Sequence, residues 1–487
     1  MLPDHSNPHH ARRWAILGIL GLAQLMVVLD ATIVNIALPS AQQALHFSND
    51  NRQWIVTAYA LAFGSLLLLG GRIGDLFGRK TTFIVGLIGF AVASAAGGAA
   101  QSFGVLVAAR ALQGAFGALL APAALSLLTT TFTDDKERNT AFGVFGAIAG
   151  SGAAVGLLLG GVLTEYLSWR WCLYVNLAFA AAATTGAATL LHNQVPADKP
   201  RLDLPGTLTA SAGLFGLVYG FSHAETAGWG APLTVVALAA AAVLLTAFVT
   251  IQRRVEHPLL PLRIVLDRTR GGAFLALALA GAGIFGVFLF LTYFLQQNLG
   301  LSPLQTGLAF LPMTATIMVT ATVATTRLVP HYGPRPMIVT GMALGAAGMV
   351  YLAQLSVGSH YAGGVLPALL IMGPGLGLIF ATAINSATAG VDPRDAGVGS
   401  AMVNTMQQVG GSVGTALLST LAASASTGYL DGRARTPAVL AQASIESYTT
   451  VFWVAAGILA LGMVVCGLLL PGRPVERSVG AAPALAH

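Results

Sequence analysis

The stretch WAILGILGLAQLMVVLDATIVNIA, from Trp14 to Ala37, is predominantly apolar, and Asp30 is its only charged residue. It exceeds the roughly 20 apolar residues that cross a ~30 Å hydrocarbon core as a helix, so it predicts a transmembrane span. An ionised group at the centre of a bilayer costs on the order of 2.5–3.5 kcal/mol. We therefore expect the Asp30 carboxylate to be paired, to face a water-filled cavity or to take up protons.

The composition of the whole chain extends this prediction beyond the first span. The chain has 487 residues, of which 55% are hydrophobic and 9% charged, against about 25% charged residues in soluble domains. The net charge of +6 then reports membrane topology and is not a sign of nucleic-acid binding. Cys172 and Cys466 each lie in an apolar stretch, so no disulfide framework is expected. The first apolar run is too long for a cleaved signal and is interpreted as an uncleaved span.

Apolar stretches of about 20 residues recur along the chain. They predict an all-α integral membrane protein with fourteen transmembrane helices. The predicted spans are 14–37, 53–71, 81–100, 103–131, 140–164, 171–191, 205–222, 232–251, 272–296, 304–326, 336–356, 361–389, 397–423 and 449–470.

The positive charges give the orientation of these spans. Of the 24 Lys and Arg residues, nineteen fall in cytoplasmic segments if the N-terminus lies inside the cell. Four fall outside, at Arg52, Arg170, Arg433 and Arg435, and Arg110 lies within a span. This asymmetry predicts a multi-pass protein of the cell (inner) membrane with both termini in the cytoplasm.

Two short segments indicate an internal repeat. GRIGDLFGRK (Gly71 to Lys80) follows the second span, and TRLVPHYGPR (Thr326 to Arg335) follows the tenth, so that Gly78 aligns with Gly333. Paired six-helix bundles around a central cavity are a recurring plan of secondary transporters. We therefore predict two pseudo-symmetric six-helix bundles, residues 1–195 and 271–487, with two inserted helices in residues 196–270.

The first of these segments also predicts a conformational latch, formed by Gly71, Asp75, Gly78, Arg79 and Lys80. Its glycines permit a tight turn and close helix approach. Asp75 stands four residues before Arg79, close enough to pair on a helical turn. A polar group of this kind can form contacts in one conformation and break them in another. The alternative is an ordinary basic inner loop.

Three motifs carry a resemblance to a known family. GRIGDLFGRK resembles the signature loop of the major facilitator superfamily. LDATIVNIALP (Leu29 to Pro39) resembles the first-span motif of its fourteen-span drug:proton antiporter family, and LVAARALQG (Leu106 to Gly114) is similar to the fourth-span motif of the superfamily. The resemblance covers residues 14–470 and implies two bundles that rock around a central site, driven by protons.

Asp30 and Arg110 are the two charges expected inside the membrane. Each lies seven residues from the outer end of its span, or about 10 Å deep at 1.5 Å per residue. In a functional interpretation, Asp30 takes up and releases a proton and Arg110 stabilises its carboxylate or passes protons. In a structural interpretation, the two form a permanent buried pair that fixes packing. The family resemblance favours the first.

The fifth span contains a stripe of glycines, Gly152, Gly156 and Gly160, four residues apart. Such a stripe allows another helix to pack backbone to backbone. It resembles the antiporter motif of drug exporters, with Leu157 at the position of a proline in that motif. General helix packing and a special role in antiport both remain open.

Polar residues within the spans are candidates to line a substrate cavity. Each alone is expected to be a hydrogen-bonding contact between helices, but as a set they favour a wet cavity. The candidates are Asn35, Tyr59, Gln113, Asn176, Tyr293, Asn404 and Gln408.

Together these features predict a proton-coupled efflux transporter that exports hydrophobic or amphipathic small molecules, such as drugs or antibiotics, by alternating access. Its partners are then the substrate, protons and the lipid bilayer, and the chain acts as a monomer without nucleic acid. No enzyme motif, cofactor motif or metal-ligand spacing is found in the sequence. The alternative is an importer or facilitator of a small metabolite on the same fold. A sensor or scaffold would bring a soluble domain, whereas the longest predicted loop, Ser424 to Tyr448, has about 25 residues.

Overall fold

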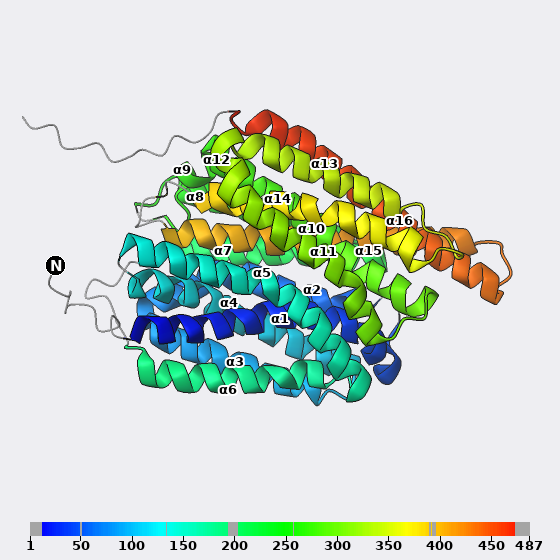
Figure 1. The fold of residues 1–487 in the computed structure, drawn as a ribbon, viewed down its shortest axis with the longest axis horizontal. Helices are drawn as coiled ribbons and strands as arrows, with labels where there is room; N and C mark the ends of the chain where they lie inside the picture. The colour runs from blue at the N-terminus through cyan, green and yellow to red at the C-terminus, as the bar shows by residue number, and fades with distance from the viewer. Residues whose placement is uncertain are drawn as a thin grey trace, which may run out of the picture.

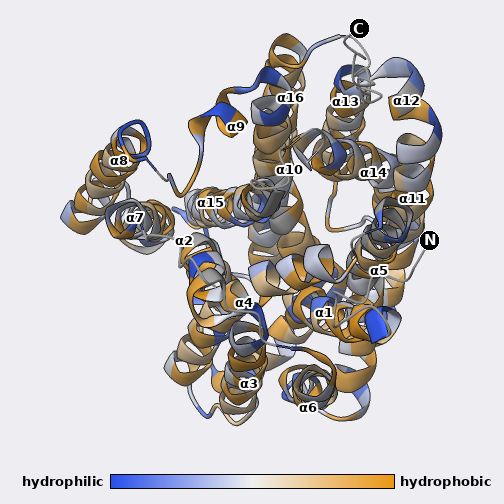
Figure 2. Ribbon diagram, turned by 90° about the vertical axis from the view of Figure 1, so that its left-hand side faces the viewer, coloured by the Kyte–Doolittle hydropathy of each residue, from blue (hydrophilic) through white to orange (hydrophobic). Residues whose placement is uncertain are grey.

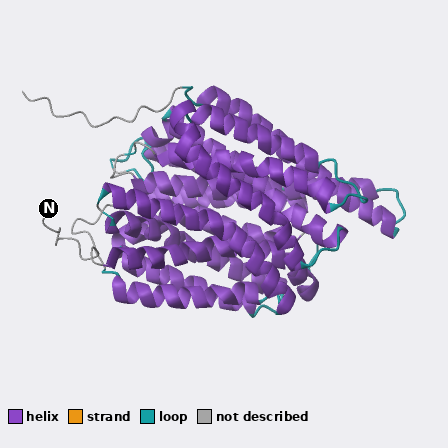
Figure 3. Cartoon of the chain, viewed as in Figure 1, coloured by secondary structure: helices purple, strands orange, loops and turns teal. Residues whose placement is uncertain are grey.

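A computed structural model describes residues 12–48, 51–132, 134–192, 203–256, 258–388, 391 and 396–472. All regular secondary structure in these residues is helical (Figure 3). The first eight helices are α1 (Arg13–Leu45), α2 (Gln53–Phe77), α3 (Arg79–Gly98), α4 (Phe103–Thr131), α5 (Asp135–Tyr166), α6 (Trp171–Leu190), α7 (Leu204–Ala227) and α8 (Pro232–Gln252). The remaining α-helices are α9 (Leu262–Leu266), α10 (Arg268–Tyr293), α11 (Pro303–Val323), α12 (Val329–Tyr332), α13 (Pro334–Leu352), α14 (Leu366–Thr388), α15 (Ala396–Leu430) and α16 (Pro437–Leu469). Three short π-helical segments extend them, η3 (Phe294–Asn298), η4 (Ala324–Leu328) and η5 (Tyr361–Val365).

Many of these helices suit a bilayer. Among the described residues, eleven helices are long and apolar enough to cross a membrane, and apolar residues dominate along the helices (Figure 2). An all-helical membrane fold, as the composition predicts, is therefore confirmed.

The long helices run side by side along the longest axis of the molecule (Figure 1). Helices α1 to α6 lie together, with α4 packed on α2 and α3, α5 on α1, and α6 on α3. Helices α10 to α16 form a second group, in which α10 packs on α15, and α13 on α14 and α16. The two groups meet where α5 contacts α11 and where α2 contacts α15. The α7–α8 pair packs through α7 on both α2 and α15, so it bridges the two groups.

The two aligned glycines of the sequence repeat have the same structural role. Gly78 alone separates α2 from α3, and Gly333 alone separates α12 from α13. Their φ angles are 90° and 78°, in a region that residues with a Cβ rarely adopt. Each segment therefore makes a one-residue turn between two helices that only glycine permits without strain.

The first and last helices allow the two ends of the helix bundle to be distinguished. The start of α1 and the end of α16 lie at the same end of the molecule (Figure 1). We use "outer end" for the opposite end, where α1 ends and α2 begins, in line with the charge-based orientation.

The prediction of a long outer loop from Ser424 to Tyr448 is wrong. Helix α15 continues to Leu430 and α16 already begins at Pro437, so both helices project at the outer end (Figure 1). Thr436 caps α16, since its side chain accepts a hydrogen bond from the Val439 amide, and Pro437 suits the first helical turn. Hydropathy predicts only the part of a helix that lies in the hydrocarbon core. The helix itself continues until a capping or helix-breaking residue ends it.

Candidate functional site

Asp30 and Arg110 are in direct contact in the interior of the first helix group. Asp30 of α1 is 0% exposed and Arg110 of α4 is 2% exposed. The Arg110 Nη1 atom donates to Asp30 Oδ2 over 2.5 Å. A charge-assisted hydrogen bond of this kind is among the stronger polar contacts in proteins. The two intramembrane charges predicted at similar depth thus form one buried ion pair.

The other carboxylate oxygen is held by two amides. Asp30 Oδ1 accepts a hydrogen bond from Gln113 Nε2 at 3.0 Å and from Asn176 Nδ2 at 2.7 Å. Both nitrogens also donate to the Ser94 hydroxyl, at 2.6 Å and 2.9 Å. Side chains from α4 and α6 therefore bond the α1 carboxylate, and Ser94 of α3 joins the two amides. An ionised carboxylate only accepts hydrogen bonds, and three donors meet it here.

Arg110 is fixed from a second side by α2. Its Nε donates to the Ile55 carbonyl at 3.3 Å, and Nη1 also donates to Gln113 Oε1 at 2.9 Å. The guanidinium carbon lies 4.4 Å from the centroid of the Tyr59 ring, within range of a cation–π interaction. We call Asp30, Tyr59, Ser94, Arg110, Gln113 and Asn176 the Asp30 site.

The local sequence explains how α2 comes so close. A Cβ at Gly114 would clash with the Tyr59 carbonyl, so glycine at this position lets α2 and α4 touch backbone to backbone. Arg110 and Gln113 are three residues apart and lie on the same face of α4. The segment LVAARALQG thus supplies the cation, one amide and the space for α2.

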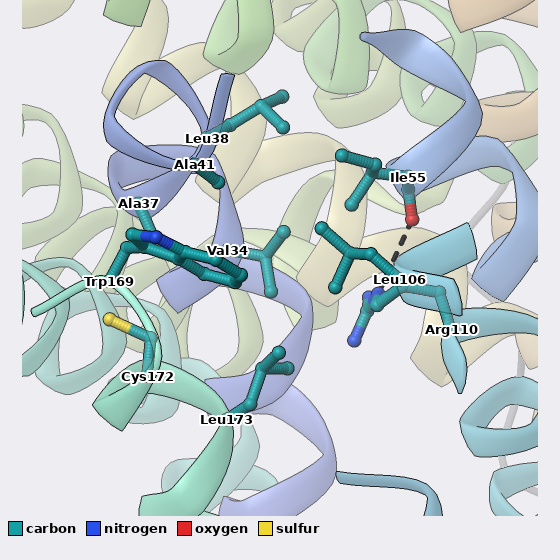
Figure 4. A pocket seen from close by; sticks show the side chains of 10 residues that line it. All are labelled: Val34, Ala37, Leu38, Ala41, Ile55, Leu106, Arg110, Trp169, Cys172 and Leu173. Atoms are coloured by element: carbon teal, nitrogen blue, oxygen red, sulfur yellow. Dashed lines mark hydrogen bonds between the residues drawn. The ribbon is translucent and has the colours of Figure 1, made fainter. Parts of the chain in front are cut away.

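Towards the outer end, an apolar pocket adjoins Arg110. Its volume is about 10 Å³, which is the room needed by about one water molecule. Figure 4 shows Arg110 at its edge, with the hydrogen bond to Ile55 and apolar side chains around it. The lining residues besides Arg110 are Val34, Ala37, Leu38, Ala41, Ile55, Leu106, Trp169, Cys172 and Leu173. A pocket this small and apolar separates the ion pair from the outer end.

The seven cavity candidates fall into different places. Tyr59, Gln113 and Asn176 belong to the Asp30 site and are buried. Asn35 is buried too and donates to the Ala31 carbonyl of its own helix. These four side chains do not line an open cavity in this conformation. Asn404 and Gln408 lie half-buried on α15.

Tyr293, the remaining candidate, joins the two helix groups at the outer end. Its hydroxyl donates to Gln42 Oε1 at 2.8 Å, and the Arg52 guanidinium carbon lies 3.9 Å from its ring centroid. Next to it, Gln296 Nε2 donates to the Ile36 carbonyl at 3.2 Å. These contacts tie α1 and α2 to α10 and η3.

A carboxylate makes a further contact between the groups at this end. Glu165 near the end of α5 accepts a hydrogen bond from the Ser302 hydroxyl at 2.6 Å and from the Leu304 amide at 3.1 Å. It thereby caps the N-terminus of α11, where a negative charge is favourable. The outer end is therefore closed by several independent polar contacts.

Sequence reasoning missed Ser94, which links the two amides of the Asp30 site. Its only signal is a hydroxyl within the apolar run FAVASAAGG (Phe90 to Gly98). A buried serine in a span is usually a local helix contact, so this signal alone does not indicate the site.

The described residues of the predicted latch make different contacts and do not form one cluster. The side chain of Asp75 lies outside the described part of the chain. Gly78 forms the turn, Arg79 begins α3, and Gly71 lies against Pro122 of α4. Lys80 Nζ donates to the carbonyls of Ala188 and Leu191 at 2.9 Å and 2.7 Å. Lys80 thus caps the C-terminus of α6, where a cation is favourable.

The glycine stripe of α5 seats the segment of α1 that carries Asp30. A Cβ at Gly152 would lie 2.9 Å from Val28, and one at Gly160 would lie 2.9 Å from Ile33. At Gly156 it would clash with the Thr32 hydroxyl. The stripe therefore lets α1 lie directly on α5 while Asp30 faces α4 and α6.

We expect Gly156→Ala to destabilise the protein by about 1–3 kcal/mol, the usual cost of overpacking. The added methyl group must displace Thr32, and with it the part of α1 next to Asp30. Thermal unfolding of purified protein measures the effect. Gly457→Ala is the control, because nothing lies within 4 Å of its Cβ position. Equal stability of the two variants would contradict close packing at the stripe.

The sequence is similar to that of a known family of membrane proteins and to several of its members. The sequence model of the Major Facilitator Superfamily matches residues 20–415. A puromycin resistance protein of Streptomyces alboniger is 49% identical, over 95% of this chain and 92% of the relative. A cephamycin export protein of Amycolatopsis lactamdurans is 40% identical, over 83% of this chain and 84% of the relative. A tetracenomycin C resistance and export protein of Streptomyces glaucescens is 34% identical, over 85% and 76%.

Solved structures share the fold at low sequence identity. An auto-inhibited peptide transporter of the POT family superposes with a TM-score of 0.69 at 16% identity, covering 95% of this chain and 98% of that one. A bacterial homologue of the lysosomal transporter Spinster gives a TM-score of 0.65 at 16% identity, over 94% and 96%.

Proposed function

Because the chain belongs to the major facilitator superfamily, we propose that it is a proton-coupled antiporter that exports hydrophobic or amphipathic antibiotics. Efflux is supported by relatives that are named for resistance to, or export of, puromycin, cephamycin and tetracenomycin C. Two of these names state export, so the proposed function is transport and not catalysis. Puromycin is the first compound to test, since the relative named for it is 49% identical over nearly the whole chain.

The proposed architecture has fourteen spans, with six-helix bundles in residues 1–195 and 271–487 and two inserted helices in residues 196–270. The matching turns at Gly78 and Gly333 support it, as do the two separate groups of packed helices. We place both termini in the cytoplasm and the protein in the cell membrane, on the charge asymmetry of the sequence. We propose that the chain acts as a monomer.

The buried pair of Asp30 and Arg110 carries the proposed coupling. A proton on Asp30 removes its charge, and the attraction that holds Arg110 is then lost. Export against a gradient needs such a group to change its bonds with each proton. Arg110 and the proton are alternative partners of the same carboxylate.

Helix α1 can transmit this change to the outer end. Ile36 and Gln42, which contact η3 and α10, lie about 9 Å and 18 Å further along the helix than Asp30, at 1.5 Å per residue. A change in the tie between α1 and α4 therefore reaches the contacts that close the outer end. In this proposal, proton binding and opening of the outer end are coupled through one continuous helix.

The test is drug accumulation in a host that lacks its own exporters. Cells that express the protein should hold less puromycin than cells with an empty vector, and an ionophore that collapses the proton gradient should abolish the difference. The importer or facilitator alternative predicts equal or higher accumulation. Panels of cephamycin and tetracenomycin C distinguish a narrow exporter from a broad one.

A further inference from the structure

One amide of the Asp30 site has an unused acceptor. Asn176 Nδ2 donates to Asp30 Oδ1 and to the Ser94 hydroxyl. Its Oδ1 is buried and makes no hydrogen bond within the described part of the chain. Buried polar atoms normally have a partner, so a carbonyl oxygen without one, next to an ionisable group, requires an explanation.

Gln113 has the same chemistry in the same place but is locked. Its Nε2 contacts the same two atoms, Asp30 Oδ1 and Ser94 Oγ. Its Oε1, however, accepts a hydrogen bond from Arg110. Turning the Gln113 amide would point its NH₂ group at a guanidinium, which has donors only. Asn176 has no such restraint.

The direction of the Asn176 amide follows the charge of Asp30. An ionised carboxylate only accepts hydrogen bonds, so the NH₂ group must face it. A protonated carboxylic acid has an O–H group that needs an acceptor. Turning the amide by 180° exchanges its nitrogen and oxygen. Oδ1 then takes the place of Nδ2, which lies 2.7 Å from Asp30 Oδ1 and 2.9 Å from Ser94 Oγ.

We propose that Asn176 is a positioning residue that serves both protonation states of Asp30 by turning its side-chain amide. The inference rests on the proposed role of Asp30 as the proton carrier. When a proton binds Oδ1 of Asp30, the new O–H donates to Asn176 Oδ1, and the Ser94 hydroxyl changes from acceptor to donor towards the same oxygen. When the proton leaves, the amide turns back and its NH₂ group holds the carboxylate.

The other groups around Asp30 are compatible with this switch. Arg110 from α4, Tyr59 from α2 and Cys172 from α6 are the ionisable groups placed near it among the described side chains. Arg110 bonds Oδ2 and Gln113, so it leaves the Oδ1 side to the two amides and Ser94. The proton and the turning amide therefore share one side of the carboxylate.

Infrared difference spectroscopy of the full chain in lipid vesicles, between low and high pH, tests both the protonation of Asp30 and the turning of the Asn176 amide. In unlabelled protein, a carboxylic-acid carbonyl band that Asp30→Asn removes reports protonation of Asp30. In protein with ¹³C at the asparagine side-chain carbonyl, we expect one amide band to move to lower frequency on protonation, because its oxygen gains two hydrogen bonds. Asn176→Leu, or Asn176→Thr if the leucine variant does not fold, should remove that band.

Labelled glutamine is the matched control, since the Gln113 carbonyl keeps its bond to Arg110 and its band should not move in the same way. An Asp30 acid band together with an unmoved Asn176 band would overturn the switch while the proposed function stands. Absence of the Asp30 acid band throughout the pH range would remove the proposed function itself.

The pH dependence of transport gives a second readout, because its midpoint reports proton release from Asp30. Asn176→Leu removes a charge-assisted bond from the ionised carboxylate, so the midpoint of proton release should move to higher pH. Asn176→Thr should move it back towards the wild type, because a hydroxyl can both donate and accept. An unchanged midpoint in Asn176→Leu would overturn the stronger, charge-assisted bond to the ionised carboxylate on which this expectation rests.

Discussion

Asp30→Asn is expected to reduce proton-driven antibiotic efflux to the level of the empty-vector host. An amide has nearly the shape of the carboxylate but cannot carry a proton on and off, so no pH gradient can drive export through this site. The loss should be at least about tenfold, since each pH unit of gradient supplies about 1.4 kcal/mol per proton carried, a factor of ten in accumulation, and the variant carries none. Vesicles with an imposed pH gradient measure it directly.

The control separates coupling from folding. Without a pH gradient, downhill exchange of substrate should persist in Asp30→Asn, because it needs the rocking of the bundles and no proton. Asp203→Asn is a matched substitution, since Asp203 is also a buried carboxylate but lies at the start of α7 beside Gln252. It should retain proton-driven efflux. Equal efflux by Asp30→Asn and the wild type would remove the proton role of Asp30.

Arg110→Met is expected to lower stability by about 3–5 kcal/mol, the typical cost of leaving one member of a buried ion pair alone. The deficit should shrink at low pH, where protonation removes the uncompensated charge on Asp30. Combining it with Asp30→Leu should recover part of the lost stability, because the double variant buries no unpaired charge, while Gln113 and Asn176 each lose one hydrogen bond. Unfolding of purified protein, arranged as a double-mutant cycle, measures the coupling.

The double variant also decides between the two interpretations of the pair. If the pair only fixes packing, Asp30→Leu with Arg110→Met should be stable and still export against a gradient. If the pair couples protons, the double variant should be stable and inactive in proton-driven efflux. A double variant no more stable than either single variant would contradict direct coupling of the two side chains.

Much of the fold is predictable from the sequence because its causes are local. Hydropathy gives the positions of the spans, since each must match the bilayer. Gly78 and Gly333 identify equivalent turns, because a positive φ angle excludes most other residues. The loop from Ser424 to Tyr448 is where this reasoning fails, since a helix can continue beyond the apolar core.

Part of the site is predictable for the same reason. A lone Asp30 in an apolar run needs a partner, and Arg110 is the one opposite charge expected at its depth. Tyr293, by contrast, looks like any polar aromatic residue in a span. Only the structure places it at the outer end with Gln42 and Arg52.

The sequence by itself therefore determined that this is a membrane protein and that Asp30 needs a cation, and its charges predict the orientation of the spans. Each of these follows from the cost of placing a charge or an unpaired backbone in hydrocarbon, which depends on residue type and spacing. The tertiary structure alone decided that Gln113 and Asn176 meet at one carboxylate oxygen and share the Ser94 hydroxyl as a second acceptor. Hydrogen bonds are directional and short, so they depend on how four helices are rotated against each other, and hydropathy carries no such information.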